Sequence, residues 1–160
     1  MIEYSVLFVC TGNTCRSPMA EGMAKQMLAQ LKGVEIDQLE EAGIRVRSAG
    51  VATGVGSPAS AQAVDAMRSV GIDLTSHAST ALTEDLIQDA DAVYTMTDSH
   101  RQAILFHSPS AADKTQPLDP RGDITDPFGA PVDIYVQTAE MIREALSQRL
   151  SERYSDIAKG

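Results

Sequence analysis

A short apolar run that ends in a polar, glycine-containing loop is the feature that most restricts how this chain folds. Residues 6–9 read Val-Leu-Phe-Val, a run typical of a strand buried on both faces of a parallel sheet. The loop that follows, residues 10–17, leads into Pro18 and then into good helix formers at residues 19–31. Proline suits the first turn of a helix, where its missing N–H is harmless. We therefore expect a strand, a loop and a helix in immediate succession.

Further strands and helices alternate along the chain. Composition and turn residues predict strands at residues 44–48, 92–96 and 114–118. They predict helices at residues 59–70, at 98–107 and from 134 to about 157, and a further helix that begins after Thr83 as its cap. Four apolar residues of the last helix are expected to share the face that packs on the sheet: Ile134, Met141, Ala145 and Leu146.

This alternation predicts an α/β fold, with helices flanking a mostly parallel sheet and right-handed crossovers. We expect one domain over residues 1–160, because no internal repeat or interdomain linker is visible and the length suits a single core. In such folds, ligands bind outside the carboxyl ends of the strands. Residues 10–17 stand at that position.

The charge and the cysteine content exclude several kinds of protein. A net charge of -9 argues against broad capture of nucleic acid or of an anionic membrane, both of which need clustered basic residues. No segment offers about 18 uninterrupted apolar residues, and residues 1–9 do not resemble a signal peptide. Two cysteines within one short segment are no framework for a secreted fold. We expect a cytoplasmic protein whose thiols serve chemistry.

The loop itself predicts a phosphate site with a nucleophile. Backbone N–H groups that turn inward before a helix form a cradle for a phosphoryl group, and Arg16 can grip two of its oxygens. The same positive field favours the thiolate of Cys10, which can attack phosphorus, and the Ser17 hydroxyl can donate to that sulfur. Neither a metal ion nor a cofactor is needed. The residues expected around the phosphoryl group are Thr11, Gly12, Asn13, Thr14, Cys15, Arg16 and Ser17.

Cys15 has two interpretations. It can be a small packing residue at the start of the helix, or it can form a disulfide with Cys10 that protects the nucleophile from overoxidation. The sequence does not choose between them.

A proton donor for the leaving group must come from outside the loop. Two Asp-Pro pairs lie in the polar stretch 119–131, at Asp119 and Asp126. We choose Asp126, because Phe128 follows it and can give the pocket an apolar wall, whereas Asp119 is interpreted as a turn residue. Asp126 would then act as a base for the water that cleaves the phosphocysteine.

These residues together resemble the low-molecular-weight protein tyrosine phosphatase family. The matching segments are residues 9–21 and 126–129, with 47–50 and 90–96 between them. The resemblance implies a four-stranded parallel sheet in the order 2-1-3-4. It also implies that Ser48 and His77 join Asn13 in a hydrogen-bonded network that supports the loop. Its substrates would be phosphorylated proteins, and inorganic phosphate would be both a product and a competitive ligand.

Thr14 departs from the tyrosine-specific pattern, in which a bulky aliphatic residue usually stands at this position. The segment 51–58 has no aromatic residue, and the chain has no Trp and only 4% aromatic residues, whereas a phenyl ring needs apolar walls. A phosphoguanidinium can instead hydrogen-bond to the Thr14 hydroxyl and to Asp126. The chain therefore resembles the bacterial protein arginine phosphatase branch, with Thr14 and Phe128 as specificity residues. The simpler alternative is that Thr14 only packs at the pocket rim.

Other functions remain as alternatives. A protein-tyrosine phosphatase of the same family is the first. An arsenate reductase would need further cysteines, and none follows Cys15. A flavodoxin-like carrier would not need Cys10 and Arg16, and a phosphopeptide-binding pseudoenzyme would not need a complete nucleophile, clamp and acid. A zinc site at His100 and His107 would lack a third ligand, so we expect surface or cap roles for both.

Overall fold

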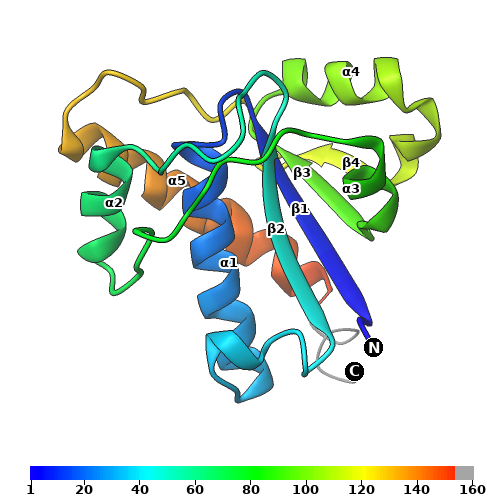
Figure 1. Ribbon diagram of the computed structural model, residues 1–160, viewed down its shortest axis with the longest axis horizontal. Helices are drawn as coiled ribbons and strands as arrows, with labels where there is room; N and C mark the ends of the chain where they lie inside the picture. Colours follow the sequence, from blue (N-terminus) through cyan, green and yellow to red (C-terminus); the bar gives the residue numbers. More distant parts are fainter. Residues whose placement is uncertain (154–160) are drawn as a thin grey trace.

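A computed structural model, which describes residues 1–153, has a four-stranded parallel sheet at its centre (Figure 1). The strands are β1 (Tyr4–Cys10), β2 (Ile44–Gly50), β3 (Ala92–Thr95) and β4 (Thr115–Pro117), in the spatial order β2-β1-β3-β4. The α/β class and this order confirm the expectation from the sequence. All strands run in one direction, so their carboxyl ends meet at one edge of the sheet.

The first strand is an apolar run because it has neighbours on every side. β1 pairs with β2 and with β3, and all seven of its residues are buried. Alternate side chains enter two separate cores, with Phe8 on one face of the sheet and Leu7 on the other. At the end of the ladder, Cys10 lies opposite Gly50 of β2.

Helices cover both faces of the sheet, which gives three layers (Figure 1). One face is covered by α1 (Arg16–Lys32), α2 (Ala61–Arg68) and α5 (Val132–Glu152), and the other by α3 (Glu84–Asp89) and α4 (Asp98–His107). Two short 3₁₀ helices, η1 (Ile36–Gln38) and η2 (Pro109–Lys114), complete the connections.

Local hydrogen bonds explain where several helices begin and end. The Thr83 side chain accepts from the Leu86 N–H and caps α3, as the sequence predicts. At the start of α4, the Thr97 side chain accepts from the His100 N–H and the His100 side chain accepts from the Thr97 N–H, which together form a capping box. α1 ends at Gly33, whose φ of 69° is the left-handed conformation that glycine adopts without strain.

The predicted packing face of the last helix was wrong for two of its four residues. Ile134 and Met141 are 37% and 39% exposed, whereas Ala145 and Leu146 are buried. Ile134 and Met141 each directly precede a buried residue, Tyr135 and Ile142, so they lie about 100° around the helix axis from it. The buried residues are Tyr135, Thr138, Ala139, Ile142, Ala145, Leu146, Arg149 and Leu150. The predicted end near Ile157 lies outside the described residues.

Within residues 1–153, none of the helices combines the length and the apolar composition that crossing a membrane requires.

Candidate active site

The phosphate-loop candidate, residues 10–17, joins the end of β1 to the start of α1. Cys10 is the last residue of β1 and Arg16 is the first of α1, so the central strand and the helix hold the two ends of the loop. Asn13 has a φ of 53°, the single positive value among the described non-glycine residues. Asparagine tolerates this conformation better than most residues, which explains its use at the turn.

The sulfur of Cys10 receives hydrogen bonds from within the loop. The backbone N–H of Asn13 points at it from 3.3 Å, and the Ser17 Oγ lies 2.9 Å away. The Asn13 side-chain amide donates to that same Oγ at 2.8 Å, so the Ser17 hydroxyl hydrogen is free to point at the sulfur. Both donors stabilise negative charge on the sulfur, as a nucleophilic thiolate requires.

Asn13 is held from several sides, and the network implied by the family resemblance is present in the structure. Its amide nitrogen also donates to the Ser48 Oγ at 2.9 Å, and its side-chain oxygen accepts from the Thr80 N–H at 2.8 Å. The His77 Nε2 lies 2.7 Å from its backbone oxygen. These bonds fix the turn whose Asn13 N–H points at the Cys10 sulfur.

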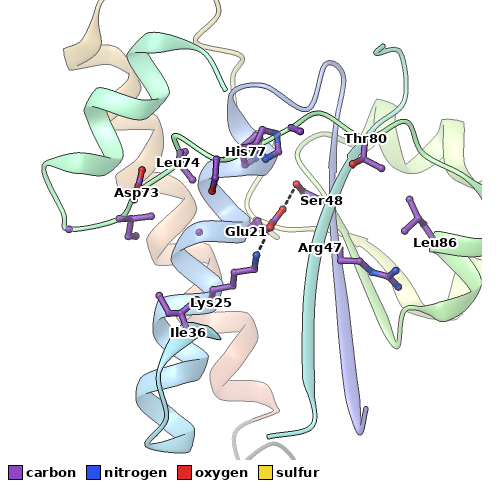
Figure 2. A pocket seen from close by; sticks show the side chains of 16 residues that line it. Glu21, Lys25, Ile36, Arg47, Ser48, Asp73, Leu74, His77, Thr80 and Leu86 are labelled. Carbon is purple, nitrogen blue, oxygen red and sulfur yellow. Dashed lines mark hydrogen bonds and ion pairs between the residues drawn. The ribbon is translucent and has the colours of Figure 1, made fainter. Parts of the chain in front are cut away.

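A cavity of about 610 Å³ lies beside this network, and Glu21 forms part of its wall (Figure 2). The Ser48 hydroxyl donates to Glu21 at 2.5 Å, and the Lys25 ammonium lies 2.7 Å from the same carboxylate. Because Ser48 donates to Glu21, its oxygen is left to accept from Asn13. Glu21 was not among the residues predicted to support the loop. Its position four residues after Ser17, on the same helix face, was the available signal.

Arg16 is buried, yet part of its guanidinium has no partner. Its Nη1 donates to the Ile124 carbonyl at 2.9 Å, and its Nη2 lies 3.6 Å from the Asp126 carboxylate. Its Nε is buried and has no hydrogen-bond partner among the described residues. A buried donor without a partner is expensive, so this atom fits a site that an anion fills.

The two Asp-Pro pairs have different surroundings. Asp119 is buried and accepts from the backbone and the guanidinium of Arg121, and these hydrogen bonds lower the pKa of its carboxyl. Asp126 keeps a half-exposed carboxylate beside Arg16 and accepts from the Phe128 N–H at 3.1 Å. Phe128 is 77% exposed. Of the two, Asp126 therefore is the one that lies beside the Arg16 guanidinium and keeps a half-exposed carboxylate that a substrate could reach.

The Cys15 side chain contacts residues outside the loop. Both cysteines are free thiols and buried in this structure. The sulfur of Cys15 is 3.3 Å from the Tyr135 hydroxyl and 3.5 Å from the Ser60 hydroxyl. Burial, together with the Cys15 contact, raises the pKa of Tyr135 to about 12, so its hydroxyl stays protonated and can donate.

Thr11, Gly12 and Thr14 are the less buried residues of the loop. The Thr11 backbone oxygen accepts from the Ala52 N–H at 3.0 Å, and the partly buried Thr14 places its Oγ1 3.9 Å from the Cys15 sulfur. Gly12 has space around its Cα.

Residues 1–153 hold no group of three His, Cys, Asp or Glu side chains with metal-binding geometry, and His100 acts as a helix cap.

Comparison with known proteins identifies the family. The model of the low molecular weight phosphotyrosine protein phosphatase family matches residues 5–158. This chain belongs to that family.

The curated relatives within the family differ in their named substrates. The protein-arginine-phosphatase of Bacillus subtilis is 39% identical over 156 residues, which cover 94% of this chain and 97% of that protein. The low molecular weight protein-tyrosine-phosphatase Etp of Escherichia coli K12 is 32% identical over 155 residues, 94% of this chain and 95% of Etp.

A solved structure of the YwlE arginine phosphatase shows the same fold. It is 38% identical, covers 95% of this chain and 97% of its own, and superposes with a TM-score of 0.83. It is a Cys-to-Ser mutant with a phosphorylated active-site serine.

Proposed function

We propose that this phosphatase removes phosphoryl groups from proteins through a covalent phosphocysteine at Cys10, and that phosphoarginine is its preferred substrate. The observation that carries the proposal is the pairing, in one loop, of a hydrogen-bonded sulfur with a buried Arg16 Nε that has no partner within residues 1–153. The free thiols suit the reducing cytoplasm, where we expect the protein to act.

In the first step, the Cys10 thiolate attacks phosphorus and an S–P bond forms as the bond to the leaving group breaks. For phosphoarginine the broken bond is P–N, and Asp126 gives its proton to the departing nitrogen. Arg16 and the inward N–H groups of the loop stabilise the charge on the phosphoryl oxygens.

In the second step, Asp126 accepts a proton from a water molecule, and the water oxygen attacks phosphorus. The S–P bond breaks, inorganic phosphate leaves and the thiolate of Cys10 is restored. Ser17 can stabilise that thiolate as it forms, because its hydroxyl already points at the sulfur. Inorganic phosphate should therefore also be a competitive ligand.

The preference for phosphoarginine rests on the loop and on the relatives. Thr14 offers a hydroxyl at the rim where a guanidinium nitrogen would pass. The chain has 4% aromatic residues and no Trp, which leaves little to stack on a phenyl ring. The B. subtilis relative named for arginine is more similar to this chain than the E. coli relative named for tyrosine. Phosphotyrosine is the second candidate because both activities occur within one family.

The deciding measurement is the ratio of kcat/KM for two peptides that differ only in carrying phosphoarginine or phosphotyrosine. The wild type should favour phosphoarginine. Thr14→Ile removes the hydroxyl and adds apolar surface, so it should shift the ratio toward phosphotyrosine by roughly 10-fold or more. Thr14→Ser, which keeps the hydroxyl, is the matched control and should retain the preference.

A ratio unchanged in Thr14→Ile would remove Thr14 as the selector. Cys10→Ser separates this question from the mechanism, because it should abolish turnover of both peptides. Residual hydrolysis near the wild-type rate in that variant would disprove the phosphocysteine route.

A further inference from the structure

His100 contacts the phosphate loop although it lies 90 positions after Cys10 in the sequence. It is in the first turn of α4, is 6% exposed, and places its Nε2 2.8 Å from the Thr11 Oγ1. Its other ring nitrogen, Nδ1, lies 3.2 Å from the Thr97 backbone nitrogen. One imidazole therefore joins a helix cap to the residue that follows the nucleophile.

The hydrogen-bond directions follow from the chemistry of the two partners. A backbone N–H can only donate, so Nδ1 of His100 must accept from Thr97 and carries no proton. Burial, and secondly the positive charge of Arg16, lower the pKa of His100 to about 4, so the ring is neutral at pH 7. Its single proton is then on Nε2, which donates to Thr11. The hydroxyl hydrogen of Thr11 remains free to point elsewhere.

Thr11 is also held from its other side. Its backbone oxygen accepts from the Ala52 N–H at 3.0 Å, and the Cys10 oxygen accepts from the Val51 N–H at 3.0 Å. The residues after β2 therefore fix the main chain of the loop, while His100 alone among the described residues bonds the Thr11 side chain. Without the His100 hydrogen bond, Thr11 would be held only through its main chain, by the residues that follow β2.

The same turn of α4 contacts the segment that carries the candidate acid. The Asp98 N–H donates to the Asp123 carboxylate at 2.8 Å. Asp123 stands three residues before Asp126, and the Ile124 carbonyl between them accepts from Arg16. The start of α4 therefore bonds both the nucleophile loop and the acid segment, and it fixes one relative to the other.

We propose that His100 is a positioning residue of the active site, whose Nε2–H holds Thr11 and thereby keeps the first half of the phosphate loop in its binding conformation. The inference rests on the proposed phosphatase function. His100 itself touches no reacting atom. Its loss should weaken phosphate binding and lower kcat/KM together, because the cradle holds the phosphoryl group in the ground state and in the transition state alike.

The experiment removes the same hydrogen bond from each side. His100→Ala and Thr11→Val should each raise the inhibition constant of inorganic phosphate and lower kcat/KM by roughly 10-fold or more. The double variant should lose little beyond the worse single one, because both changes remove one interaction. Thr11→Val leaves the His100 cap intact, so it tests the bond even if His100→Ala folds poorly.

His100→Gln provides the rescue. The amide oxygen of glutamine can accept from Thr97 and its NH₂ can donate to Thr11, so this variant should recover most of the phosphate affinity. His107→Ala, on the same helix but outside this network, is the matched control.

Phosphate inhibition within twofold of wild type in both His100→Ala and Thr11→Val would overturn the role of His100. So would losses that multiply in the double variant, since they would show that the two residues act independently. A wild-type protein that neither binds phosphate nor hydrolyses phosphopeptides would instead disprove the proposed function, so the two failures are distinguishable.

Discussion

Two identical dipeptides show that residue type does not by itself assign a role. Asp119 and Asp126 each precede a proline in one polar stretch. The carboxylate of Asp119 is buried and occupied by Arg121, while that of Asp126 is half-exposed and faces Arg16. A general acid must reach the leaving group, so environment separates the candidate acid from the turn residue.

Asp126→Asn should slow the reaction most for substrates with poor leaving groups, because these depend on the transferred proton. The expected loss in kcat is about 100-fold or more for phosphoarginine and smaller for p-nitrophenyl phosphate. A series of aryl phosphates with leaving groups of graded acidity measures the dependence. Asp119→Asn serves as the control and should keep the wild-type slope; a steeper slope in that variant would move the acid to Asp119.

At the scale of elements, the end of β2 shapes the phosphate loop through its backbone. A Cβ added at Gly50 would lie 2.7 Å from the Thr11 oxygen, 2.8 Å from the Thr53 methyl group and 3.1 Å from the Asn13 nitrogen. Contacts below 3 Å with the main chain cannot be relieved by a side-chain rotation, so strand and loop would have to separate. Gly50 is therefore required for the close approach of β2 to the loop.

Gly50→Ala should weaken inhibition by inorganic phosphate by roughly 10-fold and destabilise the fold by about 1–3 kcal/mol, because the loop must shift. Titration with phosphate and urea denaturation measure the two effects. Gly54→Ala is the matched control, since a Cβ at Gly54 meets nothing within 4 Å. Equal phosphate affinity and equal free energy of unfolding in Gly50→Ala and Gly54→Ala would show that the loop tolerates displacement.

At the scale of the whole molecule, the fold buries the imidazole ring of His100 between α4 and the phosphate loop and keeps it neutral at pH 7. Burial is the main reason that the pKa of His100 falls to about 4, and Arg16 adds to it, while Asp123 and Asp126 oppose it. In the unfolded chain the same ring titrates near 6.5. The unfolded state therefore binds more protons than the native state between these two values.

The free energy of unfolding should therefore fall as the pH is lowered from about 6.5 to about 4, by at most about 1.4 kcal/mol per pH unit from this residue. Urea denaturation across this range measures the slope. His100→Gln cannot titrate, so its slope should be smaller by this amount. Equal slopes for the wild type and His100→Gln would contradict a buried neutral His100.

Local patterns predicted the four strands and the main helices, and they brought the candidate nucleophile and clamp into one loop. The apolar run at residues 6–9, the loop with Gly12 and Asn13, and the helix start at Pro18 are contiguous, so propensity and spacing predicted β1, the loop and α1 directly. The loop chemistry could also be predicted because Cys10, Arg16 and Ser17 lie within eight residues.

Only the tertiary structure decided which distant residues support that loop and which helix stripe is buried. Gly50 and His100 contact the loop from other elements, and no local pattern encodes such contacts. On α5, packing turned Tyr135 and Ile142 inward and left Ile134 and Met141 partly exposed. The physical reason is that periodicity and propensity depend on near neighbours, whereas burial depends on how whole elements fit together.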